Sequence, residues 1–282
     1  MNKLKLVVPK GRIYAGVARL LEDSGIHIAE CSRRYAPHVS DPEIEVKIMK
    51  PQNIAQLVEL GSHAAGFTGH DWIVETGARV AEVMDLGLDP VRIVAAAPEP
   101  APAAAGKKLV VASEYENISR RYLEAKGLDY HFIRTYGATE AFPPYDADLI
   151  IDNTTTGRTL AEHGLVITDV LLESSTRFIA DPAALVDGWA RDKIEELGTL
   201  FAAVLDARKR VMLEMNVPSD KLDEVVRTLP CMRSPTVSSL YKGLGYAVKA
   251  AVPREGAARL ILRLKRLGAT DILEYEFRKV VL

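Results

Sequence analysis

Polar residues of the types that bind phosphate follow the apolar run Leu149–Ile151. Threonine hydroxyls, with the backbone N–H groups left unpaired where a helix starts, donate hydrogen bonds to a phosphate monoester, and the helix dipole favours its charge. Asp152 is placed to accept from ribose hydroxyls, and Asp148 lies four residues earlier on the same face of a strand. The predicted pocket comprises Asp148, Asp152, Asn153, Thr154, Thr155, Thr156, Gly157, Arg158 and Thr159.

A second glycine loop, Gly66–Trp72, which contains Gly69 and Asp71, also follows a short apolar run and precedes a helical pattern. Asp71 is placed to accept hydrogen bonds from a purine or a ribose, and two such loops on facing domains would line one cleft. Both loops also have a simpler interpretation, because threonine, aspartate and glycine are common where a strand turns into a helix and caps it. For each loop alone, ligand binding and helix capping remain open.

Lys10, Gly11 and Arg12 form a small basic cluster after the apolar run Leu4–Val8. Two cations beside a glycine at the carboxyl end of a strand suit a pyrophosphate or a triphosphate. Solvated surface charge explains the same pattern equally well. Glu140, three residues after Gly137, is open between a functional and a surface role in the same way.

Overall composition excludes several classes of protein. The 36 basic and 38 acidic side chains of the 282 residues nearly cancel, which disfavours binding to nucleic acid. Motifs of P-loop NTPases, zinc proteases and serine hydrolases are missing, and the six histidines and two cysteines, Cys31 and Cys231, lack metal-ligand spacing. We expect free thiols and a cytoplasmic protein outside the membrane, since neither a signal-peptide pattern nor an apolar stretch of about 20 residues occurs.

Strand and helix patterns alternate along the first 165 residues. This alternation predicts a largely parallel sheet whose ligands lie at the carboxyl ends of its strands. The Pro/Ala-rich stretch Pro98–Ala105 is expected to be a surface loop near a domain crossing. The predicted strands are Leu4–Val8, Glu43–Met49, Ala64–Phe67, Val91–Ala97, Lys108–Ala112, His131–Arg134 and Asp148–Asp152, and the predicted helices run from Ile13 to Gly25, Ile54–Leu60, Ile118–Lys126 and Gly157–His163.

The last 75 residues follow a different order. After one or two helices over Pro182–Lys209, the patterns predict strands at Arg210–Val217, Thr236–Leu240, Tyr246–Val252 and Asp271–Val281, with helices at Asp220–Leu229 and Glu255–Leu267. This βαββαβ order is the ferredoxin-like one. We therefore expect a separate domain that begins near Ala207.

Taken together, these motifs resemble the long form of the ATP phosphoribosyltransferase family over essentially the whole chain. The matching stretches are Leu-Val-Val-Pro-Lys-Gly-Arg near the start, Gly66–Glu75, and Ala-Asp-Leu-Ile-Ile-Asp followed by Thr-Gly-Arg-Thr-Leu. In the tail, Asn216-Val-Pro, Leu229-Pro, Ser234–Ser238 and Gly268–Leu273 resemble the regulatory domain of that family.

The resemblance implies an α/β fold, with two periplasmic-binding-protein-like α/β domains forming a cleft and a C-terminal ferredoxin-like (ACT-like) domain. Domain I is expected at residues 1–90 plus about 182–206, domain II at 91–181, and the regulatory domain at 207–282. The implied reaction transfers the phosphoribosyl group from phosphoribosyl pyrophosphate to N1 of ATP and releases pyrophosphate. It opens histidine biosynthesis and is inhibited by histidine.

The resemblance also assigns roles to residues. Lys10, Asp152 and Glu140 are the expected catalytic residues, and Mg²⁺ is expected to be carried mainly by the substrates, so no protein ligand is assigned to it. Histidine is expected between tail domains of neighbouring subunits of a hexamer, or of a dimer–hexamer equilibrium. The expected substrate contacts are Gly11, Arg12, Gly69, Asp71, Asp148 and Asn153 to Thr159, and the expected histidine contacts are Asn216, Thr236, Ser238 and Asp271.

The chain departs from the usual pattern of the family at three places. Ala64 and Asn53 stand where aspartate is common, and the connection 141–147 is one residue short and lacks a glycine. These departures concern the nucleotide side, and they leave open a non-catalytic nucleotide or amino-acid sensor on the same fold. A periplasmic solute-binding protein is a third alternative, which the missing signal-peptide pattern disfavours.

Overall fold

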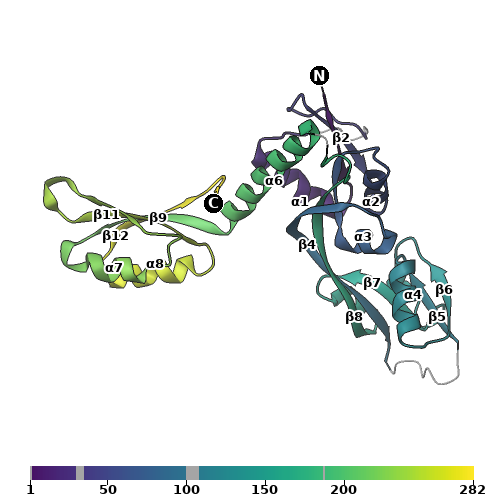
Figure 1. The fold of residues 1–282 in the computed structure, drawn as a ribbon. Coiled ribbons are helices and arrows are strands. Elements are labelled where there is room, and N and C mark those ends of the chain that lie inside the picture. The colour runs from purple at the N-terminus through teal and green to yellow at the C-terminus, as the bar shows by residue number, and fades with distance from the viewer. Residues whose placement is uncertain (1, 30–34, 100–107, 187) are drawn as a thin grey trace. The chain divides into compact units, whose positions relative to one another are not determined.

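A computed structural model describes residues 2–29, 35–99, 108–186 and 188–282, which form two compact units. One unit comprises Met1–Arg19 with Ile26–Glu195, and the other Leu20–Gly25 with Glu196–Leu282. Figure 1 shows the elements of both units along the chain. Cys31 and residues 100–105 of the expected Pro/Ala-rich loop lie outside the described residues.

An N-terminal lobe carries three parallel strands, with β1 between β2 and β3. Buried side chains occur on both faces of β1, as in other sheets covered by helices. Gly66 is required where β3 passes β1, because a Cβ there would lie 2.4 Å from Val7 Cγ1. The elements are β1 (Leu4–Pro9), α1 (Arg12–Ser24), β2 (Ile44–Met49), α2 (Pro51–Glu59), β3 (Ala65–Gly69) and α3 (His70–Thr76).

A middle lobe repeats this plan, with β5 parallel to both β6 and β7. Its core contains the fully buried Val111, Leu123 and Ile151. The expected helix and strand positions of this lobe are confirmed to within two residues. The elements are β5 (Leu109–Ser113), α4 (Glu116–Ala125), β6 (Tyr130–Arg134), the 3₁₀ turn η1 (Thr139–Ala141), β7 (Leu149–Thr154) and α5 (Arg158–Glu162).

Two long antiparallel strands, β4 (Ala81–Pro98) and β8 (Leu165–Ala180), connect the lobes into one eight-stranded sheet of order β2-β1-β3-β8-β4-β7-β5-β6. The expectation of a largely parallel sheet is therefore correct for each lobe and wrong for the centre, where β8 pairs antiparallel with β3 and β4 with β7. The first half of β4 contains Gly87 and Pro90, which are typical of turns. The strand accommodates them with register shifts and with positive φ at Gly87 and Asp89.

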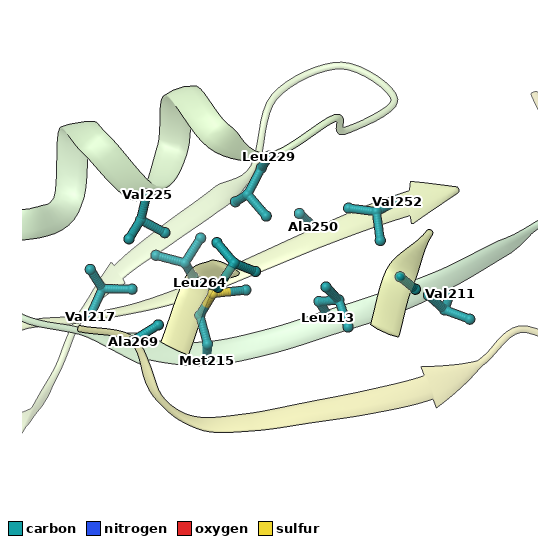
Figure 2. Close-up of a cluster of buried hydrophobic side chains, with 12 residues drawn as sticks. Val211, Leu213, Met215, Val217, Val225, Leu229, Ala250, Val252, Leu264 and Ala269 are labelled. Carbon is teal, nitrogen blue, oxygen red and sulfur yellow. The ribbon is translucent and has the colours of Figure 1, made fainter. Parts of the chain in front are cut away.

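The tail follows α6 (Gly188–Arg208) and is confirmed as ferredoxin-like. Its sheet has the antiparallel order β10-β11-β9-β12, and its two helices pack on one face. Figure 2 shows the core between them, in which Leu213, Met215 and Leu264 meet. The elements are β9 (Arg210–Val217), η2 (Ser219–Lys221), α7 (Leu222–Thr228), β10 (Thr236–Ser239), η3 (Tyr241–Gly243), β11 (Tyr246–Pro253), α8 (Ala257–Arg266) and β12 (Thr270–Glu276).

The helices of the described residues include none that combines the length and the apolar character needed to cross a lipid bilayer.

The last strand, β12, ends at Glu276, five residues earlier than expected. Val281 and Leu282 are largely exposed and add nothing to the tail core.

Candidate active site

Three neighbouring pockets in the larger unit share lining residues, and we call them together the cleft. The first, the threonine pocket, has a volume of about 340 Å³ and is lined by Arg12, Glu140, Asp152–Thr156 and Arg158–Leu160. The central pocket, about 160 Å³, shares Arg12 and Asn153 with it and adds Lys10, Gln52, Gly69, Asp71, Trp72, Asp89, Glu114, Tyr115 and Ser174–Thr176. The outer pocket, about 460 Å³, shares Gln52, Trp72 and Glu114 with the central one and extends to Arg134 and Tyr136.

The loop between β7 and α5 forms the wall of the threonine pocket. Thr154 Oγ1 accepts a hydrogen bond from Gly157 N at 2.9 Å, which closes the loop on itself. Gly157 has φ +81°, a conformation that favours glycine, and it is the N-cap residue of α5. The exposed hydroxyls of Thr155 and Thr159 line the pocket instead of holding the loop. This loop-closing hydrogen bond gives Thr154 a structural role and leaves the other two hydroxyls available to a ligand.

Asp152 lies in the second half of β7 and lines this pocket. Its Oδ1 accepts hydrogen bonds from Asn153 N at 2.7 Å and from Asn153 Nδ2 at 3.3 Å. Burial raises the pKa of the Asp152 carboxyl from 3.8 to about 6, the Asn153 N–H opposes this, and the nearby carboxylates of Glu140 and Glu114 add to it. Near neutral pH Asp152 is therefore an anion held in a poorly solvated position.

Asp148 does not join the other residues of the predicted pocket. Its carboxylate accepts a hydrogen bond from Val110 N at 2.9 Å and so fixes β7 against the start of β5. A strand rises about 3.3 Å per residue, so the four residues to Asp152 span about 13 Å. The two carboxylates share a strand face but not a pocket, and the expected substrate contact of Asp148 has no support in the structure.

The basic cluster after β1 faces the same cleft. Lys10 lines the central pocket, and Arg12 lines both the central and the threonine pockets. Gly11 between them has φ +81°, so the turn that presents the two cations favours a glycine. Glu140, on η1, reaches the threonine pocket beside Asp152. The structure thus brings Lys10, Arg12, Glu140 and Asp152 to one cleft, as expected from the sequence.

Asp71 is held inside the central pocket and not at the surface of its helix. Its carboxylate accepts hydrogen bonds from Tyr115 Oη at 2.8 Å and from Ser174 Oγ at 2.6 Å. Gly69 makes room for it, because a Cβ at that residue would lie 2.1 Å from Asp71 Oδ1. The carboxylate is bound by residues of β8 and of the segment after β5, so the helix-capping interpretation of Asp71 is wrong.

Several residues of the cleft were not predicted from the sequence. Ser174 and Thr176 belong to β8, which was not predicted as a strand, so no sequence signal placed them here. Tyr115 lies two residues after β5, and its position near the carboxyl end of a parallel strand was a usable signal. Gln52 Oε1, Asp89 Oδ2 and Thr176 Oγ1 are buried in the cleft, with no hydrogen-bond partner among the described residues.

Glu75, the last acidic residue of α3, joins the two lobes beside the cleft. Its carboxylate oxygens accept hydrogen bonds from Asn117 N and Ile118 N, both at 3.0 Å, in the first turn of α4. A carboxylate at that place satisfies two backbone donors and complements the helix dipole. Glu75, itself buried, therefore caps a helix of the other lobe.

Replacement of Glu75 by alanine is expected to lower the free energy of unfolding by about 2 kcal/mol, because two N–H groups of the first turn, one of them buried, lose their acceptor. Urea unfolding monitored by circular dichroism measures the loss. Glu59→Ala is the matched control, since Glu59 accepts from the exposed Arg79 and its loss should matter far less. Equal losses in the two variants would contradict the cap.

The four residues predicted to bind a regulator lie on the tail sheet. Asn216 Nδ2 donates a hydrogen bond to Asp271 Oδ2 at 2.9 Å, and Asp271 occupies the irregularity of β12 with φ +49°. Ser238 stands in register with Asn216 across β11, through Ala247. Thr236 lies two residues before Ser238 and shares its face. This face is opposite the buried side chains Met215 and Val217 that pack on the helices.

Comparison with known proteins places both parts of the chain. The family model HisG, ATP phosphoribosyltransferase, matches residues 50–203, and the model of the HisG C-terminal domain matches residues 207–279. The ATP phosphoribosyltransferase of Chlorobium phaeovibrioides is 38% identical over 286 residues, which are 99% of this chain and 97% of that protein. The ATP phosphoribosyltransferase of Desulforudis audaxviator is 39% identical over 287 residues, 99% of each chain.

Among solved structures, a chain of the ATP phosphoribosyl transferase (HisG:HisZ) complex from Thermotoga maritima superposes with a TM-score of 0.63 at 26% identity. The superposition covers 70% of this chain and 98% of that one.

Proposed function

The chain belongs to the ATP phosphoribosyltransferase family of histidine biosynthesis, and we infer from its cleft how it transfers a phosphoribosyl group to ATP. One observation carries the assignment of the donor side: the threonine loop, Asp152 and Arg12 line a single pocket that opens into a second pocket with an aromatic wall. A pentose phosphate and a purine nucleotide need two such neighbouring pockets.

We propose that phosphoribosyl pyrophosphate binds in the threonine pocket. Hydroxyls of Thr155, Thr156 and Thr159 and the N–H groups of the loop would hold its 5-phosphate, with Arg158 balancing the charge. Asp152 would accept hydrogen bonds from the ribose hydroxyls. Lys10 and Arg12 lie on the side of the central pocket, where the pyrophosphate would leave.

The reaction needs positioning and charge stabilisation more than a nucleophilic side chain. N1 of ATP forms a bond to the anomeric carbon while the bond from that carbon to the pyrophosphate oxygen breaks, and pyrophosphate leaves with the bonding electrons. The ribose passes through an oxocarbenium-like state, which the anionic Asp152 stabilises if held close to the ring. Lys10 and Arg12 neutralise the charge that develops on the leaving group.

We propose that Mg²⁺ enters as a complex with the pyrophosphate group of the donor. Among the described residues no group of three or more His, Cys, Asp or Glu side chains is arranged to hold a metal ion. Mg²⁺ commonly binds through substrate phosphates, one or two carboxylates and water. The ion would supply further neutralisation of the leaving pyrophosphate. We also propose a cytoplasmic location, because the reaction consumes ATP.

The activity is tested by incubating the full-length protein with ATP, phosphoribosyl pyrophosphate and MgCl₂. We expect equal amounts of pyrophosphate and phosphoribosyl-ATP, measured by a coupled phosphate assay and by chromatography. Binding of both substrates without either product would instead support the nucleotide sensor that the departures at Ala64 and Asn53 left open.

We further propose that histidine binds the tail at Asn216, Thr236, Ser238 and Asp271 and inhibits the transfer. The support is their common sheet face and the hydrogen bond between Asn216 and Asp271, which places a carboxylate ready to bind an ammonium group. A hexamer, in equilibrium with dimers, is proposed from the exposed apolar side chains of β10 and β12, namely Val237, Leu273 and Tyr275. Sedimentation with and without histidine measures the assembly.

Replacement of Asp271 by alanine is expected to raise the histidine concentration for half-inhibition at least about tenfold, because a hydrogen bond to a charged group is lost. Basal kcat should not change, since Asp271 belongs to the smaller unit. Glu276→Ala is the matched control: Glu276 also lies on β12, but its carboxylate pairs with Arg254. Unchanged histidine inhibition in the Asp271 variant would refute the assigned site.

A further inference from the structure

Tyr115 is a deeply buried side chain of the cleft whose hydroxyl the proposed reaction leaves without a role. It lies two residues after the end of β5, its exposed fraction is 1%, and its ring stacks on Trp72 with a centroid distance of 4.6 Å. A phenylalanine ring would fill the same space. Only the hydroxyl distinguishes tyrosine from phenylalanine here, and at a buried position it must form hydrogen bonds to offset its loss of contact with water.

The hydroxyl joins the two loops of the cleft. It donates a hydrogen bond to Asp71 Oδ2 at 2.8 Å and accepts one from Asn153 Nδ2 at 3.2 Å. Burial, and then the charge and the hydrogen bond of Asp71, raise the pKa of Tyr115 well above its ordinary value, so the group remains a hydroxyl. Its only proton is committed to Asp71, and it can offer Asn153 only a lone pair.

This direction fixes the orientation of the Asn153 amide. The NH₂ group lies between two acceptors, Tyr115 Oη and Asp152 Oδ1, the latter at 3.3 Å. A flipped amide would place its oxygen against both of these oxygens and would be repelled. Asp71 is itself held by Ser174 Oγ at 2.6 Å. One chain of hydrogen bonds therefore runs from β8 through Asp71, Tyr115 and Asn153 to Asp152.

We propose that Tyr115 is a positioning residue for the transfer, whose hydroxyl orients the Asn153 amide and thereby holds the Asp152 carboxylate toward the ribose of the donor. The inference rests on the proposed role of Asp152. It adds a dependence between the two sides of the cleft, because Asp71 lies on the loop of the N-terminal lobe and Asp152 on the loop of the middle lobe. The Asp152 carboxylate is oriented toward the ribose only when the loop that carries Asp71 is in place.

Other charges around Asp152 stay the same when the hydroxyl is removed. The carboxylates of Glu140 on η1 and Glu114 beside Tyr115 face Asp152, and the cations of Arg12 on α1 and Arg158 on α5 line the same pocket. A change in the titration of Asp152 on loss of the Tyr115 hydroxyl therefore reports the Asn153 amide. Loss of a hydrogen bond to the charged form raises the pKa of a carboxyl.

The test is Tyr115→Phe, which keeps the ring against Trp72. We expect kcat to fall about tenfold with the KM for phosphoribosyl pyrophosphate changed less than about twofold, since the interaction acts on the reacting state. The acidic limb of the pH–rate profile should move upward by about half a unit from its position near pH 6. Tyr122→Phe is the matched control, because Tyr122 also lies on the α4 side but donates to Asp169 outside the cleft.

A double-mutant cycle separates positioning from general damage. Asn153→Ala should reproduce both effects, and adding Tyr115→Phe to it should change little further, because the two residues act in one chain. Additive losses, or a fall in kcat with an unmoved acidic limb, would overturn the proposal. Thermal unfolding of each variant identifies any loss that comes from misfolding.

A measurement without turnover keeps this inference separate from the proposed function. The Asp152 carboxyl carbon, assigned by its absence in Asp152→Asn, is titrated by ¹³C NMR in the wild type and in Tyr115→Phe. A higher pKa in the variant supports the chain of hydrogen bonds even if the wild type makes no product. An equal pKa in both overturns it even if the wild type is fully active.

Discussion

Replacement of Asp152 by asparagine is expected to lower kcat about 100- to 1,000-fold, the cost typical of removing one group that stabilises charge in a transition state. Asparagine keeps the shape and an oxygen that can accept from Asn153 N, so the loop should keep its conformation. The negative charge beside the developing oxocarbenium is lost. Steady-state kinetics with both substrates varied measures the effect, and a kcat within about tenfold of wild type would exclude Asp152 from the proposed role.

The same substitution is expected to stabilise the folded protein at neutral pH. Burial raises the pKa of Asp152 from 3.8 to about 6, so as pH rises from about 4 to about 6 the unfolded chain releases this proton first, and stability falls. Above pH 6 the buried carboxylate therefore lowers the free energy of unfolding, on the order of 2 kcal/mol after allowance for its partial exposure. Asparagine avoids that cost.

Urea unfolding at two pH values checks this sign. The Asp152 variant should be more stable than the wild type at pH 7, and the gain should shrink at pH 4, where the carboxyl is protonated in the folded wild type and only partly ionised in the unfolded chain. Asp169→Asn is the control of opposite sign, because the Tyr122 hydrogen bond lowers the pKa of Asp169 and its carboxylate is not strained by burial. A loss of stability in the Asp152 variant at pH 7 would contradict the assigned environment.

Residues that follow parallel strands were predictable from the sequence, because local patterns determine them. Leu4–Pro9 is largely apolar, and Leu149–Thr154 begins with the apolar run Leu149–Ile151 and ends in polar residues. The carboxyl ends of parallel strands meet at one edge of a sheet. Lys10, Arg12 and Asp152 consequently reach one cleft, as expected. The βαββαβ tail was predictable for the same reason, since alternation in Arg210–Val217 separates its buried from its exposed face.

Residues that depend on pairing between distant strands were not predictable. β8 was missed because Thr168, Glu173 and Ser174 interrupt its apolar pattern, and it is held by β4 and β3 more than by its own composition. With β8 missing, neither the antiparallel centre of the sheet nor the Ser174 contact to Asp71 could follow. The Asp148 error has a related cause: period-two alternation gives the face of a strand and not the distance along it.

The loop between β7 and α5 is expected to bind the 5-phosphate of phosphoribosyl pyrophosphate through Thr155 and Thr156. The double substitution Thr155→Ala, Thr156→Ala is expected to raise the KM for phosphoribosyl pyrophosphate about 100-fold with kcat nearly unchanged. Two hydrogen bonds to a dianion are lost, each of about 1.5 kcal/mol or more, and the 5-phosphate is remote from the reacting carbon. Binding lost equally in the ground and transition states raises KM alone. Both threonines are exposed at the pocket, so the fold should tolerate alanine.

A control variant and a second ligand show whether the rise in KM comes from lost contacts to the 5-phosphate. Thr228→Ala removes a hydroxyl that donates to Glu224 O on α7 in the tail and should leave the donor KM unchanged. The KM for ATP should change little in either variant, because we propose that the purine binds at the central pocket, lined by Gly69, Asp71 and Trp72. Inorganic pyrophosphate lacks the pentose phosphate, so it should inhibit the double variant and the wild type equally. An unchanged donor KM would show that the threonines only shape the turn, and the donor phosphate would have to bind elsewhere in the cleft.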